Sequence, residues 1–275
     1  MSTVGQKERL TQNRVVRLLK KLRYTYLGNW EERANNSNIE EAELRSYLKR
    51  QGYAETLITR ALYELNREAG DQTRSLYDIN KAVYSLLRYG VKVRADVGEN
   101  TETVWLIDWK EPLNNDFAFA EEVTVKGEHT KRPDIVLYVN GIALGVLELK
   151  RSVVSVGEGI RQNLDNQKKT FIQPFFTTIQ LIMAGNDTEG LRYGVIETHE
   201  KYYLTWKEES RIENLLDRHL TQLCGKQRLL EIIHDFVVFD AGVKKICRPN
   251  QYFGVRKAQE RVHRREGGII WHTQG

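Results

Sequence analysis

The sequence predicts an α/β fold of the α+β kind, in which helices flank a mixed central sheet and the N-terminal region is helical. Apolar side chains recur at helical spacing over residues 1–90. Short apolar runs bounded by turn residues follow over 91–206, and helical spacing returns over 210–235. Each apolar face has to be buried against another layer, so this order of segments favours a sheet covered by helices.

The N-terminal region is predicted to be mainly helical. Residues 8–23 place leucines and valines on one helical face, as an amphipathic helix requires. The polar run 35–38 interrupts this pattern, and its Ser37 or Asn38 offers an N-cap for the next helix. Further helices are expected over 40–50, 54–69 and 78–88.

The middle of the chain carries the strand candidates. The first is residues 103–107, which are rich in the β-branched and aromatic side chains that pleated sheets favour. A segment with helical spacing, residues 157–170, interrupts the strands. The other strand candidates are separated by turn signals and cover residues 116–120, 123–125, 135–149, 178–183, 193–197 and 202–206.

The C-terminal segment, residues 236–275, is predicted to link the sheet domain to a further domain. Residues 255–266 are basic and have helical spacing, and Gly267-Gly268 separates them from an apolar strand candidate at 269–275. A complete domain rarely ends on an apolar strand that runs into a glycine. We therefore expect the chain to be the leading part of a longer protein.

The composition indicates a soluble globular protein, with 40% hydrophobic and 29% charged residues in 275. The net charge of +5, from 42 basic and 37 acidic residues, permits DNA binding without demonstrating it. Two cysteines, Cys224 and Cys247, are too few for a disulfide framework or a zinc site, which favours an intracellular protein. The sequence shows no signal peptide and no apolar run of membrane-spanning length, so no membrane partner is expected.

Residues 132–150 contain the most informative pattern in the chain. Two apolar runs are joined by Asn140-Gly141, and Asp134, Glu148 and Lys150 are the charged residues at their far ends. Carboxylates are costly inside a sheet unless they bind a metal or are paired. A lysine two residues after a glutamate lies on the same side of a strand. The pattern therefore predicts two metal-binding acids and an ammonium group in one place, which is the equipment needed to cut a phosphodiester bond.

The hairpin register decides whether these groups meet. A strict two-residue turn at Asn140-Gly141 would pair Asp134 with Leu147 and turn Glu148 to the opposite face. A three-residue loop over 139–141, with a bulge, would pair Asp134 with Val146 and bring the three charged groups to one face. We therefore expect an odd-length loop or an equivalent bulge.

Pro133-Asp134 followed by Glu148-Leu149-Lys150 resembles the motif of the PD-(D/E)xK nuclease superfamily. Longer segments resemble the amino-terminal part of the restriction, or motor, subunit of type I restriction–modification enzymes. The resemblance covers nearly all of the chain. Its carrying segments are residues 11–16, 77, 82–90, 132–150, 159–167 and 267–275.

The resemblance implies Mg²⁺-dependent cleavage of double-stranded DNA. Asp134 and Glu148 would bind the Mg²⁺, with the backbone carbonyl of Leu149 as a further ligand, and Lys150 would orient the attacking water and stabilise the developing negative charge. Gln162 is expected to assist from the following helix. Related nucleases carry a Gln-x-x-x-Tyr motif there, but this chain has Asn166 in place of the tyrosine, and Gln167 is a rival for the glutamine.

The resemblance also predicts the domain organisation. Residues 1–90 would be a helical region packed on the nuclease core, 91–235 the core itself, and 236–275 a linker and the start of a truncated helicase-type ATPase motor domain. Arg256 and Gln259 resemble the element that reads adenine in the motor, although a basic surface helix explains them equally well. The chain lacks the phosphate-binding lysine and serine, so ATP is expected as a cofactor of the full-length enzyme only.

The expected partners are double-stranded DNA and the modification and specificity subunits, in a prokaryotic cytoplasm. Two alternatives stay open: a non-catalytic module that binds DNA and docks subunits, and an independent repair or recombination nuclease of the same superfamily. Any phosphate contacts would come from basic residues near the motif, whose other explanation is ordinary solvated charge. They are Lys126, Lys131, Arg132, Arg151, Arg161, Lys168 and Lys169.

Overall fold

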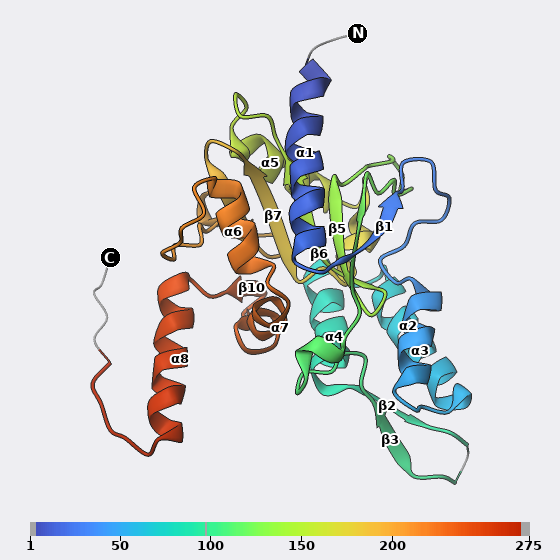
Figure 1. Cartoon of the computed structure of the whole chain (residues 1–275). Helices are drawn as coiled ribbons and strands as arrows, with labels where there is room; N and C mark the ends of the chain where they lie inside the picture. The colour runs from blue at the N-terminus through green and yellow to red at the C-terminus, as the bar shows by residue number, and fades with distance from the viewer. Residues whose placement is uncertain (1–3, 97, 271–275) are drawn as a thin grey trace.

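The computed structural model describes residues 4–96 and 98–270, and a six-stranded mixed sheet forms its centre (Figure 1). Strands β1 and β4 are parallel, as are β6 and β7, and the other neighbours are antiparallel. The predicted mixed sheet flanked by helices is confirmed. In spatial order the strands are β1 (Thr25–Asn29), β4 (Phe117–Glu121), β5 (Ile135–Val139), β6 (Ile142–Leu149), β7 (Leu181–Asn186) and β8 (Gly190–Gly194).

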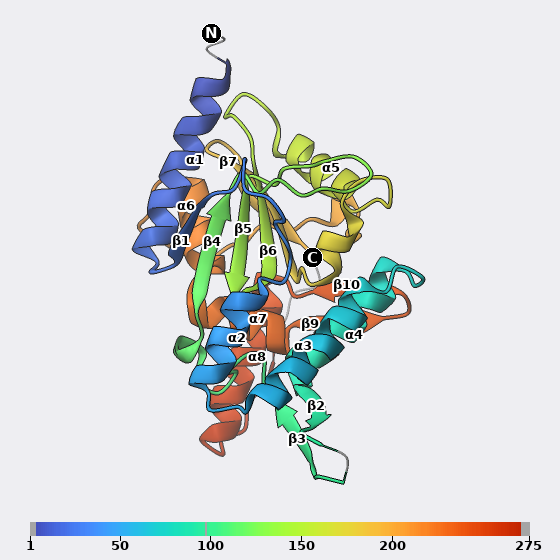
Figure 2. The same ribbon diagram turned by 90° about the vertical axis from the view of Figure 1, so that its right-hand side faces the viewer.

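Helices cover both faces of the sheet, which accounts for the apolar character of its central strands. Helices α1 (Val4–Lys21) and α6 (Leu215–Leu223) lie on one face, and α5 (Val156–Asn166) lies on the other (Figure 2). Every residue of β5 and β6 is buried. The side chains of each strand alternate between two hydrophobic cores, one beneath α1 and the other beneath α5.

A helical group with a short hairpin lies at one end of the sheet (Figure 1). It consists of α2 (Glu41–Arg50), α3 (Glu55–Gly70), α4 (Leu76–Tyr89), β2 (Val91–Arg94) and β3 (Thr101–Val104). The prediction of helices in this region is confirmed. The sequence missed β1 and β2, however, and β1 makes the N-terminal region contribute an edge strand to the central sheet.

Two predicted strands are wrong. Residues 123–125 and 202–206 form only the isolated bridges Val125–Lys131 and Tyr193–Leu204, and a short 3₁₀ helix, η3 (Glu200–Tyr202), begins the second segment. Both segments have suitable strand composition, but neither finds a partner strand long enough to make a ladder. Two further 3₁₀ turns are η1 (Pro112–Asn114) and η2 (Gln173–Thr177).

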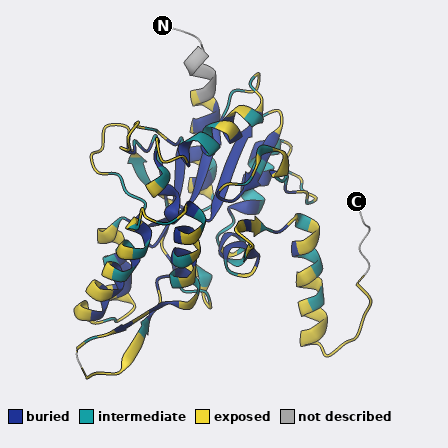
Figure 3. Cartoon of the chain, turned by 180° about the vertical axis from the view of Figure 1, so that it is seen from behind, coloured by how far each residue is buried: buried dark blue, intermediate teal, exposed yellow. Residues whose placement is uncertain are grey.

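The C-terminal part contains more elements than the sequence predicted. The expected helix over 210–235 is two helices, α6 and α7 (Lys226–Asp235), which break at Cys224-Gly225. A hairpin of β9 (Val237–Asp240) and β10 (Val243–Ile246) follows, and then α8 (Pro249–His263). Most of α8 is exposed (Figure 3), and its only buried residue is Tyr252. Of the predicted last strand, Ile269 and Ile270 are exposed and not in a strand, and 271–275 lie outside the described residues.

No helix among residues 4–96 and 98–270 has both the length and the apolar character needed to cross a membrane.

A buried lysine joins the β9–β10 hairpin to the rest of the fold. Lys244 is only 3% exposed. Its Nζ donates to Asn80 Oδ1 at 2.7 Å and to Gln180 Oε1 at 2.5 Å, and neither partner is a carboxylate. Burial lowers the pKa of Lys244 well below its ordinary value.

This lowered pKa predicts a pH-dependent stability. Between the lowered pKa and the ordinary value of 10.5, the unfolded chain holds a proton at Lys244 that the folded chain does not. The free energy of unfolding therefore rises with pH in that window, by up to about 1.4 kcal/mol per pH unit. Urea unfolding at neutral and mildly alkaline pH should show the wild type gaining stability relative to Lys244→Met. An equal difference between the two proteins at both pH values would contradict the lowered pKa.

Candidate functional site

A bulge in β6 sets the register of the hairpin that carries the predicted acids. Asn140 and Gly141 form a two-residue turn with φ values of +51° and +81°, as a hairpin turn of the primed type requires. Val139 pairs with Ile142 and Tyr138 with Ala143, but Leu137 pairs with Gly145. Leu144 is therefore an extra residue on β6.

The bulge moves Asp134 and Glu148 to the same face of the sheet. Beyond the bulge, Ile135 pairs with Leu147, and one further step along this register places Asp134 opposite Glu148. Without Leu144 the pairing would turn Glu148 towards the core beneath α1. The charged end of the hairpin lies instead on the face that α5 covers.

The predicted three-residue loop is wrong, and so is the pairing of Asp134 with Val146, whereas the alternative of an equivalent bulge is confirmed. The physical reason lies in the turn itself. Asn140 and Gly141 both tolerate positive φ. The side chain of Asn140 is also anchored, because its Nδ2 donates to Leu106 O at 2.9 Å and to Asn115 Oδ1 at 2.7 Å.

Hydrogen bonds fix the three charged groups. Lys150 Nζ donates to Glu148 Oε1 at 2.9 Å and to Gln162 Oε1 at 2.8 Å. Asp134 Oδ2 accepts a hydrogen bond from the backbone N–H of Leu149 at 2.6 Å. Glu148 is 1% exposed, and the side chain of Lys150 is 14% exposed. The structure thus brings Glu148, Lys150 and Gln162 into direct contact and ties Asp134 to the strand between them.

A glycine allows α5 to approach this group closely. A Cβ atom on Gly159 would lie 3.1 Å from Ala184 Cβ and 3.5 Å from the Cγ atoms of Glu148 and Lys150. Gln162 is three residues further along the helix and therefore lies on the same helical side as Gly159. The helix begins at a Ser155 cap, which accepts a hydrogen bond from the backbone N–H of Gly157. The side of α5 that carries Gly159 therefore packs close to the strand, and this places the Gln162 amide against Lys150.

Gln167, the other candidate for the accessory glutamine, bonds to backbone groups and stabilises the fold. Gln167 Nε2 donates to Asn163 O at 2.9 Å, and Gln167 Oε1 accepts from Glu197 N at 2.6 Å. These bonds tie the end of α5 to the turn after β8. Asn166, which stands where related nucleases have tyrosine, is buried, and its amide makes no hydrogen bond within the described part of the chain. Gln162 is therefore the glutamine that contacts the candidate site.

A basic hollow of about 640 Å³ opens over the site. Three of the predicted basic residues line it beside Lys150, namely Lys131, Arg151 and Arg161. The other four do not line it, and Arg132 and Lys168 are held by ion pairs with Glu122 and Asp165. The full lining is Lys131, Lys150, Arg151, Val154, Glu158, Arg161, Gln162 and Asp165.

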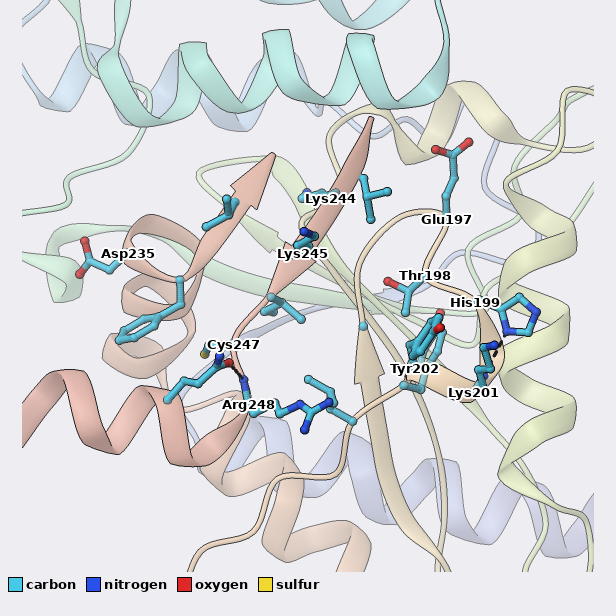
Figure 4. Close-up of a pocket in the computed structure, with 18 residues that line it drawn as sticks. Glu197, Thr198, His199, Lys201, Tyr202, Asp235, Lys244, Lys245, Cys247 and Arg248 are labelled. Atoms are coloured by element: carbon cyan, nitrogen blue, oxygen red, sulfur yellow. Dashed lines mark hydrogen bonds between the residues drawn. The ribbon is translucent and has the colours of Figure 1, made fainter. Parts of the chain in front are cut away.

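A larger hollow of about 870 Å³ lies elsewhere, between the turn after β8 and the β9–β10 hairpin (Figure 4). Its two acids, Glu197 and Asp235, come from opposite sides and do not converge (Figure 4). None of Asp134, Glu148 and Lys150 lines it. Lys150 and Gln162 line the smaller hollow, and the buried Glu148 contacts Lys150 from beneath it, so we place the candidate site at the floor of that hollow.

The donor atoms of the candidate site suit a hard cation. Among residues 4–96 and 98–270, no three histidine, cysteine or acidic side chains gather in a way that could hold a metal ion. An ion at this site would thus be bound by two carboxylates and by water or backbone oxygen. Mg²⁺ is commonly held in that way, whereas structural zinc requires four protein ligands with nitrogen or sulfur.

The residues predicted to read adenine lie apart from this site. Arg256, on α8, pairs through Nη1 with Glu231 Oε1 at 2.9 Å. Gln259 is exposed on the same helix. Neither residue lines either hollow. Their proposed role in the motor stays a prediction.

Residues 5–201 match the family model described as type I restriction enzyme R protein N terminus. The chain belongs to this family. Over 223 residues it is 29% identical to the type I restriction enzyme HindI endonuclease subunit of Haemophilus influenzae, covering 71% of this chain and 21% of that protein. Over 198 residues it is 24% identical to the SauMSSORF170P endonuclease subunit of Staphylococcus aureus, covering 69% of this chain and 21% of that protein.

The family assignment confirms, over residues 5–201, the resemblance to the amino-terminal part of the restriction subunit of type I enzymes. The chain spans about a fifth of the length of the curated relatives that it matches. The matched region contains the whole hairpin and α5, and hence every residue of the candidate site.

Proposed function

We propose that this chain is the Mg²⁺-dependent endonuclease part of a type I restriction enzyme and that it cuts phosphodiester bonds of double-stranded DNA. The observation that carries the proposal is the contact of Lys150 with Glu148 and Gln162. The bulge in β6 places this group on the same face as Asp134. The names of the relatives, which are endonuclease subunits, support the same function.

Asp134 and Glu148 are the proposed ligands of the ion. When bound, Mg²⁺ supplies a water of lowered pKa and offsets negative charge on the scissile phosphate. The Leu149 N–H donates to Asp134 Oδ2, which fixes the orientation of that carboxylate. The backbone carbonyl of Leu149 is the proposed additional ligand.

Lys150 is the proposed catalytic cation. Its ammonium group is positioned by two acceptors, Glu148 Oε1 and Gln162 Oε1, so little reorganisation is needed when negative charge develops on the phosphate. This ammonium group would orient the attacking water and stabilise the negative charge that develops on the phosphate. Lys150 also lines the basic hollow, through which a DNA strand would approach.

The basic hollow supplies the proposed contacts to neighbouring phosphates. Lys131 Nζ lies 4.2 Å from the centre of the Phe171 ring, and Arg161 pairs with Glu158 of the same helix and with Glu200. Contacts between these basic side chains and DNA phosphates would make the affinity for DNA fall steeply as the salt concentration rises. For the complete enzyme, we propose that motor domains drive translocation along DNA with ATP. The modification and specificity subunits are its proposed partners.

Substitution of Gln162 tests whether this residue positions Lys150 for cleavage or only stabilises the fold. In the complete enzyme, Gln162→Ala should lower the DNA cleavage rate about tenfold, because Lys150 loses one of the two acceptors that hold its ammonium group. The matched variant Gln167→Ala removes a glutamine of the same helix that bonds only to backbone. It should lower the free energy of unfolding by about 1–3 kcal/mol and leave the cleavage rate of the folded enzyme unchanged.

The measurement is metal-dependent cleavage of a plasmid substrate, with urea unfolding of each variant. A Gln162→Ala enzyme that cuts at the wild-type rate would remove Gln162 from the site.

A further inference from the structure

A row of basic side chains lies on the outer side of α1 and just past its C-terminal end, on the face of the sheet opposite to the candidate site. The row consists of Arg9, Arg17, Lys20, Lys21 and Arg23, all of which are exposed. We call it the α1 basic row. The inner side of the same helix packs into the core through Val15 and Leu19. Figure 2 shows α1 and α5 on opposite faces of the sheet.

The cations of the α1 basic row differ from Arg14 in their ion pairing. No side chain of the row makes an ion pair with any residue that the structure describes. Arg14 of the same helix behaves differently, because its guanidinium pairs with Asp187 and, through Nε, with Asp217 Oδ1 at 2.9 Å. Thr11 Oγ1 also donates to Asp187 Oδ2 at 3.0 Å. The inner polar residues therefore hold the helix in place. The outer cations are exposed, and one of them, Lys20, has its Nζ 4.2 Å from the centre of the Tyr26 ring.

This arrangement opposes the stability of the fold. Like charges three or four residues apart on a helix repel one another, as Arg17 does with Lys20 and Lys21. The helix dipole favours cations only in the last turn, so it accounts for Lys20 and Lys21 but not for Arg9. The buried face of the helix would be served equally well by neutral polar residues on the outside. Repulsion within the row indicates that its charge serves binding.

Arg23 gives a second and independent indication. It follows the helix with φ of +66°, the left-handed cap position that glycine favours and that a side chain strains. Its charge also helps to lower the pKa of Lys226, which burial lowers first. A cation at this position thus costs stability twice, through its backbone and through its charge.

We propose that the α1 basic row binds the phosphate backbone of double-stranded DNA and forms a second DNA contact outside the cleft. Arg9 and Lys20 are separated by about 16 Å along the helix axis, a distance over which a duplex presents about ten phosphate charges. The proposal rests on the proposed function only for the identity of the polymer, and it requires no catalysis.

The chemistry of the row favours a duplex over other anionic partners. Single strands are held by aromatic side chains on which bases stack. The aromatic ring beside the row, that of Tyr26, is already in contact with Lys20, and its hydroxyl bonds to Glu121. Protein interfaces have apolar or aromatic anchors at their centre. Among the α1 residues whose burial the structure describes, 9–21, Leu10 is the exposed apolar side chain, and it lies at one end of the row. A surface of cations alone suits a phosphate backbone.

The first test compares two variants: one lacks three charges of the row, and the other lacks three charges elsewhere on the surface. The variant is Arg17→Gln/Lys20→Gln/Lys21→Gln. The matched control is Arg60→Gln/Lys81→Gln/Lys92→Gln, whose residues are also exposed and make no ion pair within the described residues. Fluorescence anisotropy of a labelled duplex, without divalent ions and over a series of salt concentrations, gives the affinity of the 275-residue chain for DNA.

The row variant should bind the duplex at least about tenfold more weakly than the control, and its log–log salt slope should be smaller by about two to three units. Arg23→Gly provides the sharper readout, because it should raise the urea midpoint of unfolding while lowering DNA affinity. If Arg23 served only the fold, the Arg23→Gly variant would lose both stability and DNA affinity.

Equal DNA affinity for the row variant and the control, with no loss in Arg23→Gly, would overturn the proposal and favour an acidic protein partner for this face. Failure of the proposed nuclease function would show separately, as cleavage that survives substitution of Lys150, because binding through α1 does not involve the cleft.

Discussion

Lys150→Ala is expected to lower DNA cleavage by the complete restriction enzyme at least about a hundredfold while ATP-driven translocation continues. Lys150 Nζ lies between Glu148 Oε1 and Gln162 Oε1 and lines the basic hollow, so its loss removes the positioned cation from the site. Lys150→Arg should not restore activity, because a planar guanidinium cannot take the place of a compact ammonium group between these two acceptors. The readouts are linearisation of a plasmid that carries the recognition site and displacement of a triplex-forming strand by the motor.

Lys92→Ala is the matched control, because Lys92 is an exposed lysine on β2 and lines neither hollow. It should cut and translocate as the wild type does. If the Lys150→Ala enzyme both translocates and cuts normally, the nuclease assignment is wrong, and the chain is better described as a module that binds DNA and docks other subunits.

Deletion of Leu144 is expected to abolish both stable folding and cleavage. Leu144 is the extra residue of the bulge, and a strictly paired hairpin would turn Glu148 and Lys150 towards the core beneath α1. Burying a charged pair in that apolar core costs several kcal/mol, which is comparable to the whole stability of a domain. Urea unfolding and plasmid cleavage measure the two effects.

Leu144→Ala separates the register from the packing. Leu144 is fully buried, so its truncation should lower the free energy of unfolding by about 2–5 kcal/mol. It keeps the number of residues in β6, however, and the folded variant should still cut DNA. A deletion variant that folds and cuts as well as Leu144→Ala would show that the bulge does not position the site.

The sequence was sufficient to predict the hairpin and the contact between Glu148 and Lys150. Strand periodicity placed Glu148 and Lys150 on one side, and the need to bring Asp134 to the same side required a bulge or an odd loop. The position of the bulge was not predictable. It lies at Leu144, next to Gly145, in a run of apolar residues. One extra residue at any of several positions in this run would turn Glu148 to the same face of the sheet.

The elements missed in the sequence depend on partners that are distant along the chain. Strand β1 is a short edge strand with only partly buried residues, and its partner β4 comes about ninety residues later. Conversely, residues 202–206 have strand composition but make a single bridge, Tyr193–Leu204. Composition indicates that a segment is able to form a strand, whereas the ladder forms only where tertiary structure supplies a neighbour.

Lys244 reverses the usual alternation of a strand. In β10 the valine at 243 is exposed and the lysine at 244 is buried. The polar groups that receive the ammonium come from α4 and from the segment before β7, through Asn80 and Gln180. No local pattern predicts such a site, because the acceptors belong to two segments that meet the hairpin only in the folded chain.

The central claim is that Asp134 and Glu148 share one divalent ion. Crystals of the chain soaked with Mn²⁺, with the ion located by its anomalous scattering, test it most directly. We predict an ion within about 2.3 Å of a carboxylate oxygen of each residue, near the backbone carbonyl of Leu149. A well-ordered structure that has no ion at this position, with the two carboxylates on different sides of the sheet, would contradict the account.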